Sequence, residues 1–171
     1  MIDLGGSVGL TFYGYRKRAE LPAGVRWTIV EVPHLVAAGR KIAARESADA
    51  LSFETDMSSV ARCDVLLAAG VLQDMQISIP ELLERRSKLP RHILLNKVPF
   101  THHADFWTLH NFGPAITPYR LFNEQEFLLY FTQRGYEVVD RWDVTDMSCD
   151  IPFHPDRTVE RFTGLYLALA S

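Results

Sequence analysis

The sequence has few cysteines, no excess of basic residues and no long apolar run. Cys63 and Cys149 form no CxxC pair, so the sequence predicts neither a zinc knuckle nor a disulfide framework. A formal charge of -3 provides no basic surface for nucleic-acid phosphates or anionic lipid. No apolar stretch approaches the ~20 residues that span a bilayer. We therefore expect no nucleic-acid partner, no membrane partner and no bound metal.

The start of the chain carries no targeting signal. No basic segment followed by an apolar one precedes the first globular residues, so a signal peptide is not predicted and we expect a cytoplasmic protein. The first strand has only Met1 to Leu4 before a glycine turn, whereas a buried strand usually has about 5–6 residues. We therefore expect the natural chain to begin further upstream.

The composition and the order of the elements favour one α/β domain over residues 1–171. Hydrophobic residues make up 47% and charged residues 23%, as in ordinary globular domains. Strand-like and helix-like runs alternate, which predicts a mainly parallel sheet with helices on both faces. Strands are expected at 1–4, 26–32, 50–53, 64–69, 92–98, 136–144 and 158–169, and helices at 10–20, 33–45, 78–89 and 123–135.

Two features complete this expected fold. No helix precedes the last strand, so we place that strand antiparallel to the strand at 136–144. Residues 99–122 are rich in aromatic residues, His, Gly and Pro, and we expect a long irregular loop on the substrate side of the domain.

A glycine-rich turn follows the first strand. Asp3-Leu-Gly5-Gly6-Ser7-Val8-Gly9 would let the backbone approach a cofactor closely. The turn is not the dinucleotide fingerprint G-x-G-x-x-G, which needs glycine at Ser7 and Leu10. Asp3 could contact the amino end of an amino-acid-like cofactor, directly or through water. A tight strand-to-helix turn without a ligand is the alternative.

An acidic residue follows the second strand at a suitable spacing. Glu31 stands 22 positions after Gly9, where a carboxylate can accept hydrogen bonds from both ribose hydroxyls of an adenosine. The loop after the fourth strand, Gly70-Val71-Leu72-Gln73, should lie at the same sheet edge. An exposed Glu and a plain connecting loop are the alternatives.

These motifs together resemble class I S-adenosylmethionine-dependent methyltransferases. The resemblance runs from IDLGGSVG through IVEVP, DVLLAAGVLQ and HILLNKVPF to the closing strands. It implies a Rossmann-like seven-stranded mixed sheet with an antiparallel last strand, and S-adenosylmethionine as cofactor. The residues that it places at the cofactor are Asp3, Gly5, Gly6, Ser7, Gly9, Glu31, Ser52, Phe53, Gly70, Val71 and Leu72.

The chain is also similar to an uncharacterised bacterial methyltransferase family. That likeness lies at GGSVGLTFYGY, FWTLHNFGPAITPYRLFN and IPFHP, and it implies a reaction class without naming a substrate. One departure concerns plant-type O-methyltransferases, which carry a His as general base after the fourth strand. Gln73 stands in the comparable position and cannot accept a proton in that role.

The segment 99–122 offers the candidates for the acceptor side. His103 and His110 are the candidate general bases, because histidine titrates near neutrality. A small-molecule or saccharide-like acceptor could contact Gln73, His102, Trp107, Asn111, Tyr119 and Arg120.

Two other functions remain open. One is a cofactor-binding module without catalysis on a degenerate methyltransferase fold, which Gln73 favours. The other is a nicotinamide-dependent oxidoreductase, which the absent G-x-G-x-x-G disfavours.

Overall fold

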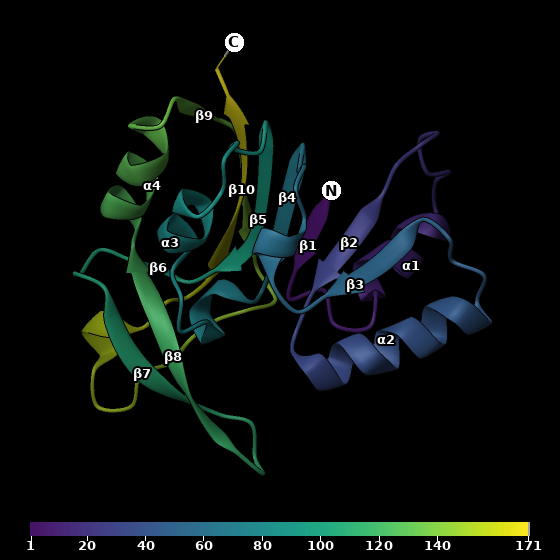
Figure 1. The fold of residues 1–171 in the computed structure, drawn as a ribbon. Helices are drawn as coiled ribbons and strands as arrows, with labels where there is room; N and C mark the ends of the chain where they lie inside the picture. Colours follow the sequence, from purple (N-terminus) through teal and green to yellow (C-terminus); the bar gives the residue numbers. More distant parts are fainter. Residues whose placement is uncertain (171) are drawn as a thin grey trace.

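A seven-stranded sheet forms the centre of the molecule, with the strand order β3-β2-β1-β4-β5-β10-β9 (Figure 1). The computed structural model describes residues 1–170. The first five strands are parallel, and β10 is antiparallel to both of its neighbours, β5 and β9. The predicted α/β fold with an antiparallel last strand is confirmed. The strands are β1 (Ile2–Leu4), β2 (Trp27–Val30), β3 (Leu51–Glu54), β4 (Val65–Ala69), β5 (His92–Val98), β9 (Tyr136–Val144) and β10 (Phe162–Leu169).

Four α-helices and three short 3-10 turns connect these strands. The helix at 33–45 is confirmed to the residue, whereas α1 ends earlier than predicted and α3 ends well before Leu89. No helix within residues 1–170 is long and apolar enough to cross a membrane. The helices are α1 (Leu10–Arg16), α2 (Pro33–Arg45), α3 (Ile79–Glu84) and α4 (Glu124–Thr132), and the 3-10 turns are η1 (Met57–Ser59), η2 (Leu72–Asp74) and η3 (Pro155–Arg157).

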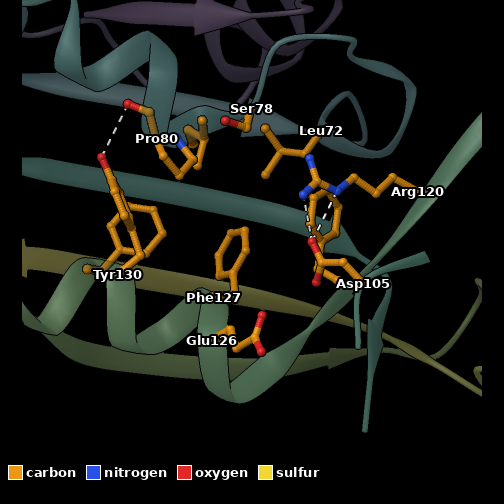
Figure 2. Close-up of a pocket in the computed structure, with 11 residues that line it drawn as sticks. Leu72, Ser78, Pro80, Asp105, Arg120, Glu126, Phe127 and Tyr130 are labelled. Carbon is orange, nitrogen blue, oxygen red and sulfur yellow. Dashed lines mark hydrogen bonds and ion pairs between the residues drawn. The ribbon is translucent and has the colours of Figure 1, made fainter. Parts of the chain in front are cut away.

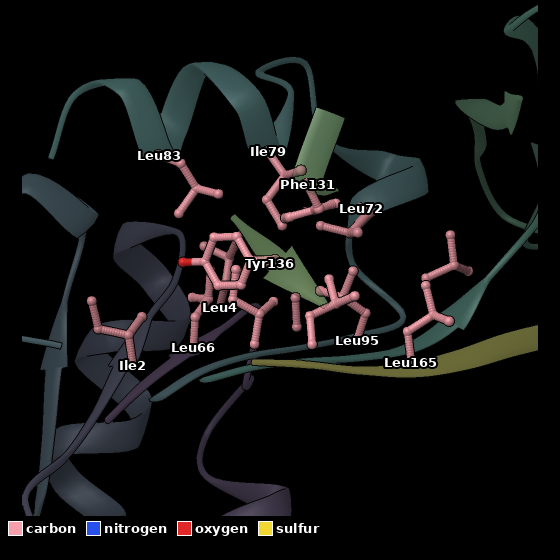
Figure 3. Packing of buried hydrophobic residues seen from close by; sticks show 14 of the residues in the cluster. Ile2, Leu4, Leu66, Leu72, Ile79, Leu83, Leu95, Phe131, Tyr136 and Leu165 are labelled. Atoms are coloured by element: carbon pink, nitrogen blue, oxygen red, sulfur yellow. The ribbon is translucent and has the colours of Figure 1, made fainter. Parts of the chain in front are cut away.

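The two faces of the sheet are covered differently. Helices α3 and α4 lie on one face, where the largest core contains Leu66, Leu95 and Phe131 (Figure 3). Helices α1 and α2 lie on the other face, where a second core packs Phe12 of α1 against Trp27 of β2. Cores of this kind supply most of the folding free energy through removal of apolar area from water.

The expectation of an irregular loop at 99–122 is wrong. This segment forms a second, three-stranded sheet of β6 (Phe100–Thr101), β7 (Phe106–Asn111) and β8 (Ile116–Asn123), in which β7 and β8 are an antiparallel hairpin. The hairpin extends beyond the end of β5 (Figure 1). Its outer face carries apolar side chains, with Leu109 70% exposed, so the sequence lacks the polar–apolar alternation by which a half-buried strand is recognised.

The N-terminus of α3 has the capping box predicted from Ser78 and Glu81. The Ser78 Oγ accepts from the Glu81 N–H, and the Glu81 carboxylate accepts from the Ser78 N–H at 2.9 Å. We expect Ser78→Ala to lower the free energy of unfolding by about 1 kcal/mol, because it leaves a helix N–H without a partner. Urea denaturation measures this loss. Ser87→Ala, an exposed serine just after the same helix, is the control and should leave stability unchanged.

Candidate functional site

The carboxyl ends of β1, β2, β3 and β4 meet at one edge of the sheet. Leu4 pairs in register with both Val30 and Ala68, and Val30 pairs with Glu54. Strand order reverses between β1 and β4, so this edge contains the switch point at which open α/β sheets bind ligands. The glycine turn, Glu31 and the loop after β4 all begin at this edge.

The glycine turn folds tightly over the end of β1. The Gly5 N–H donates to the Val30 carbonyl at 2.9 Å, and the Gly9 N–H donates to the Gly6 carbonyl at 3.1 Å. Gly5 has φ of +70°, and a Cβ there would lie 2.4 Å from the Val71 side chain. Glycine is therefore required at this position both for its conformation and for the close approach of the loop after β4.

Glu31 lies beside this turn, as the spacing predicts. Its carboxylate accepts from the Ser7 N–H at 3.2 Å and from the Val32 N–H at 2.8 Å. Each carboxylate oxygen has about two lone-pair sites, so both retain capacity for a further donor. The arrangement therefore provides acceptors for two neighbouring hydroxyl groups at the end of β2.

Asp3 lies directly under the glycine turn and is only 1% exposed. Its Oδ2 accepts from the Trp27 indole N–H at 3.0 Å, and a Cβ at Gly6 would lie 2.7 Å from its carboxyl group. Burial raises the pKa of Asp3 to about 6; the Trp27 bond opposes this rise, and the nearby Glu31 charge adds to it. A buried carboxylate with one bonded oxygen is suited to a cationic partner.

A cavity of about 450 Å³ adjoins the turn on the side of the sheet that carries α1. Asp3, Gly6 and Ser7 line one end, and Asn96, Lys97 and Trp142 line the other. The backbone between Asp3 and Ser7 has no side chain that fills this space. The cavity adjoins the glycine turn, and the Glu31 carboxylate accepts from the Ser7 N–H of the same turn.

Three residues expected at the cofactor have side chains that contact other parts of the protein. Phe53 is 2% exposed and its ring packs against Gly39 of α2, so its side chain is part of the core beneath α2. Ser52 lies two positions before the end of β3, where its hydroxyl bonds that of Thr28. Leu72 is buried in the core beneath α3. Each of these three side chains packs on a face of the sheet and not at the edge where the parallel strands end.

The loop after β4 leads from the glycine turn to the hairpin. The Gly70 N–H donates to the Asn96 carbonyl at 2.9 Å, and Val71 packs on Gly5. Gln73 is 2% exposed and lies near Tyr119 of β8, and its Oε1 has no hydrogen-bond partner within residues 1–170. Burial, followed by the nearby Asp74 charge, raises the pKa of the Tyr119 hydroxyl well above its usual value.

The candidate histidines lie in two different places. His110 of β7 packs edge-on against Tyr119, with ring centroids 4.9 Å apart. Burial raises the pKa of the Asp74 carboxyl, and the nearby His110 opposes this rise. His103 follows β6, and its Nε2 bonds the Asp156 carbonyl at 3.0 Å. His102 is exposed beside it. The structure therefore places His110 next to Tyr119, and none of the three histidines lines the cavity.

The remaining candidates from the hairpin also lie outside the cavity. Trp107 and Asn111 lie on its exposed outer face. The Arg120 guanidinium binds the Asp105 carboxylate at 2.7 Å, so its charge is already paired. This pair lies at a second pocket of about 160 Å³ between α3, α4 and β8, where Phe127 and Tyr130 form apolar walls (Figure 2).

Sequence reasoning missed four contributors to the site. Trp27 binds Asp3 from 24 positions away, and Asn96, Lys97 and Trp142 close the far end of the cavity. A polar Asn-Lys pair at the end of an otherwise apolar strand is the only sequence signal for two of them. Within residues 1–170, no three His, Cys, Asp or Glu side chains gather in a way that could hold a metal ion.

Comparison with known proteins supports the fold. No family model matches the chain, and no curated relative matches it. The glycopeptide N-methyltransferase MtfA in complex with S-adenosylmethionine superposes with a TM-score of 0.63 at 14% identity, over 99% of this chain and 81% of that one. The [4+2]-cyclase SpnF gives 0.66 at 15% identity, over 98% and 73%.

A third solved structure comes from Burkholderia thailandensis. Its 1,6-didemethyltoxoflavin-N1-methyltransferase, with 1,6-didemethyltoxoflavin and S-adenosylhomocysteine bound, gives a TM-score of 0.61 at 18% identity, over 99% of this chain and 70% of that one. The chain therefore has the fold of class I S-adenosylmethionine-dependent methyltransferases.

Proposed function

We propose that this protein binds S-adenosylmethionine at the edge formed by β1, β2 and β4 and transfers its methyl group to a small-molecule or saccharide-like acceptor. The observation that carries the proposal is the position of the Glu31 carboxylate, which accepts from the Ser7 N–H of the glycine turn. One crevice thereby offers acceptors for a ribose and, beneath Gly6, the buried Asp3 carboxyl for an amino group.

Different residues of the site would contact different parts of the ligand. Glu31 would accept hydrogen bonds from the ribose hydroxyls, and the Gly5–Gly6 backbone would adjoin the chain that carries the sulfur. Val71 would pack beside the adenosine. The bound donor supplies an activated methyl group on a sulfonium. What the protein adds is orientation, which can contribute effective molarities of ~10⁵ M or more.

We propose His110 as the residue that accepts a proton from a hydroxyl acceptor. It stands next to Tyr119, which lies near Gln73 at the exit of β4, and no hydrogen-bond partner within residues 1–170 occupies its buried Nδ1. A positioned general base is typically worth ~10²–10⁴-fold in rate. The exposed position of His103 against the Asp156 carbonyl suits it less for this role.

Binding of S-adenosylhomocysteine to the purified protein tests the proposal. Isothermal titration calorimetry should show one site per chain for this ligand and no heat of binding for NADH. Binding of NADH without S-adenosylhomocysteine would instead support the oxidoreductase, and the absence of binding for both would refute the proposed site.

A second candidate function is a cofactor-binding protein that does not transfer methyl groups. Two observations favour it: Gln73 occupies the position after β4 and is fully buried, and a [4+2]-cyclase shares this fold. Fold alone does not determine the reaction. Co-purified S-adenosylmethionine that stays unconverted with a panel of hydroxylated acceptors would favour this function, whereas release of S-adenosylhomocysteine would exclude it.

A further inference from the structure

The pocket between α3, α4 and β8, here called the α3–α4 pocket, lies apart from the cavity at the glycine turn (Figure 2). Leu72 and Ile79 line it and belong to the core on the α3–α4 face of the sheet. On β4, Ala68 faces that core, whereas Leu67 lines the cavity on the opposite face. The two hollows share no lining residue, so a molecule in the α3–α4 pocket would not lie beside the methyl donor.

The walls of the α3–α4 pocket are aromatic. Phe127 packs edge-on against Phe122 with ring centroids 5.5 Å apart, and Tyr130 packs edge-on against Phe131 at 5.2 Å. The Tyr130 hydroxyl donates to the Pro80 carbonyl at 3.3 Å, which ties α4 to α3 at the pocket. The volume is about 160 Å³, and an apolar cavity of about 150 Å³ accepts one benzene. The size and the walls therefore fit a single aromatic ring.

The polar side of the pocket has an excess of negative charge. The Arg120 guanidinium binds the Asp105 carboxylate through its Nε at 3.1 Å and its Nη2 at 2.7 Å, so these two charges balance. Glu126 also lines the pocket and is exposed, and none of the ion pairs found among residues 1–170 includes it. A carboxylate beside aromatic rings attracts a cation, because the faces of the rings carry partial negative charge.

We propose that the α3–α4 pocket is a second binding site, for a small amine that carries one aromatic ring. The ring would lie among Phe122, Phe127 and Tyr130, and the ammonium group would face the Glu126 carboxylate. A ring in this position would contact both Leu72 of η2 and Phe122 of β8. It would thereby connect the loop after β4 with the hairpin, from the face opposite the cavity.

Three probes that share one ring and differ in charge test this inference. At pH 7 benzylamine is a cation, benzyl alcohol is neutral and benzoate is an anion. We expect benzylamine to bind about fivefold more tightly than benzyl alcohol, because an exposed charge pair adds a modest attraction. Benzoate should show no binding, because Glu126 repels it. Titrations followed by ligand-observed NMR measure the three affinities.

Two variants of acidic residues test the role of charge. Glu126→Gln should weaken benzylamine to the level of benzyl alcohol and leave benzyl alcohol unchanged, because the amide keeps the size of the side chain and removes its charge. Glu160→Gln is the matched control, at an exposed acid that does not line the pocket, and should change neither affinity.

Two larger side chains test the position of the ring. Ile79→Trp, at a buried position in α3, should occupy the pocket and remove the binding of both benzylamine and benzyl alcohol. Overpacking can destabilise a core, so Phe127→Trp supplies a second filled variant at a half-buried position in α4. A thermal melt identifies which variants remain folded.

Each contrary result overturns the inference in a different way. Equal affinity for all three probes, or an unchanged preference for benzylamine in Glu126→Gln, would show that the carboxylate selects nothing. Binding that persists in a folded, filled variant would place the ring elsewhere. Displacement of benzylamine by excess S-adenosylhomocysteine would place it at the donor site. A protein that binds benzylamine as expected and does not bind S-adenosylhomocysteine contradicts the proposed function alone.

Discussion

Asp3→Asn is expected to raise the free energy of unfolding at pH 7 by about 3 kcal/mol. Burial holds the pKa of Asp3 at about 6 in the folded protein, against 3.8 for an exposed carboxyl, and this difference corresponds to about 3 kcal/mol. At pH 7 the wild type must keep a buried charge, whereas the variant keeps a neutral amide. The Asn oxygen can still accept from the Trp27 indole at the position of the present 3.0 Å bond.

The sign of the pH dependence follows from the direction of this pKa change. The folded state holds the Asp3 proton more tightly than the unfolded state, so the wild type loses stability as pH rises from about 4 to about 6. The loss is nearly complete at pH 7, about one unit above the folded pKa of Asp3. Asp3→Asn has no carboxyl that titrates at this position. The difference in free energy of unfolding between the variant and the wild type should therefore be small at pH 4 and reach its full value at pH 7.

Urea denaturation at both pH values measures this difference. Asp49→Asn, an exposed carboxylate in the turn before β3, is the control and should match the wild type at both. Equal stability of Asp3→Asn and wild type at pH 7 would show that the buried carboxyl costs nothing. The same variant should bind S-adenosylhomocysteine less well, because a neutral amide cannot balance an ammonium group.

Glu31→Ala is expected to weaken S-adenosylhomocysteine by about 10- to 100-fold, or about 1.4 to 2.8 kcal/mol. The carboxylate would supply two charge-assisted acceptors to the ribose, each worth about 1.5–3 kcal/mol before solvation is offset. The variant also loses the tether to the Ser7 N–H, which loosens the glycine turn. Both effects act in the same direction.

S-adenosylhomocysteine and 5′-methylthioadenosine together test the ribose contact, because both contain the ribose and only the first carries the amino-acid end. 5′-Methylthioadenosine retains the ribose, so Glu31→Ala should weaken it as much as it weakens S-adenosylhomocysteine. Glu137→Ala, an exposed acid on β9 at the far edge of the sheet, is the control. Unchanged affinity of Glu31→Ala for both ligands would remove the ribose role.

Much of the sheet and the starts of all four helices could be predicted because their signals are local. Pro33 at the first turn of α2, the Ser78 capping box and the Asn123 cap of α4 are all present as expected. Strands β5 and β9 have the predicted bounds because buried or flanking residues mark their ends. The β7–β8 hairpin was missed because its outer face is apolar, which hides the period of two.

The site was predictable only where spacing along the chain determines it. Glu31 was found because a βαβ unit fixes the distance from the glycine turn. Lys97 could not be found, because nothing in a lysine signals a left-handed backbone. Trp142 lies 46 positions from Asn96, and only the insertion of β10 beside β5 brings them together.

The central place of β10 also affects when the protein can first hold a ligand. Because β10 inserts between β5 and β9, the indole of Trp142 reaches Asn96 only after the last strand has joined the sheet. A nascent chain that lacks its final residues would carry the glycine turn and Glu31 but only half of the cavity. Any ligand that needs both ends of the cavity would therefore bind only molecules in which β10 has joined the sheet, and it would stabilise them by mass action.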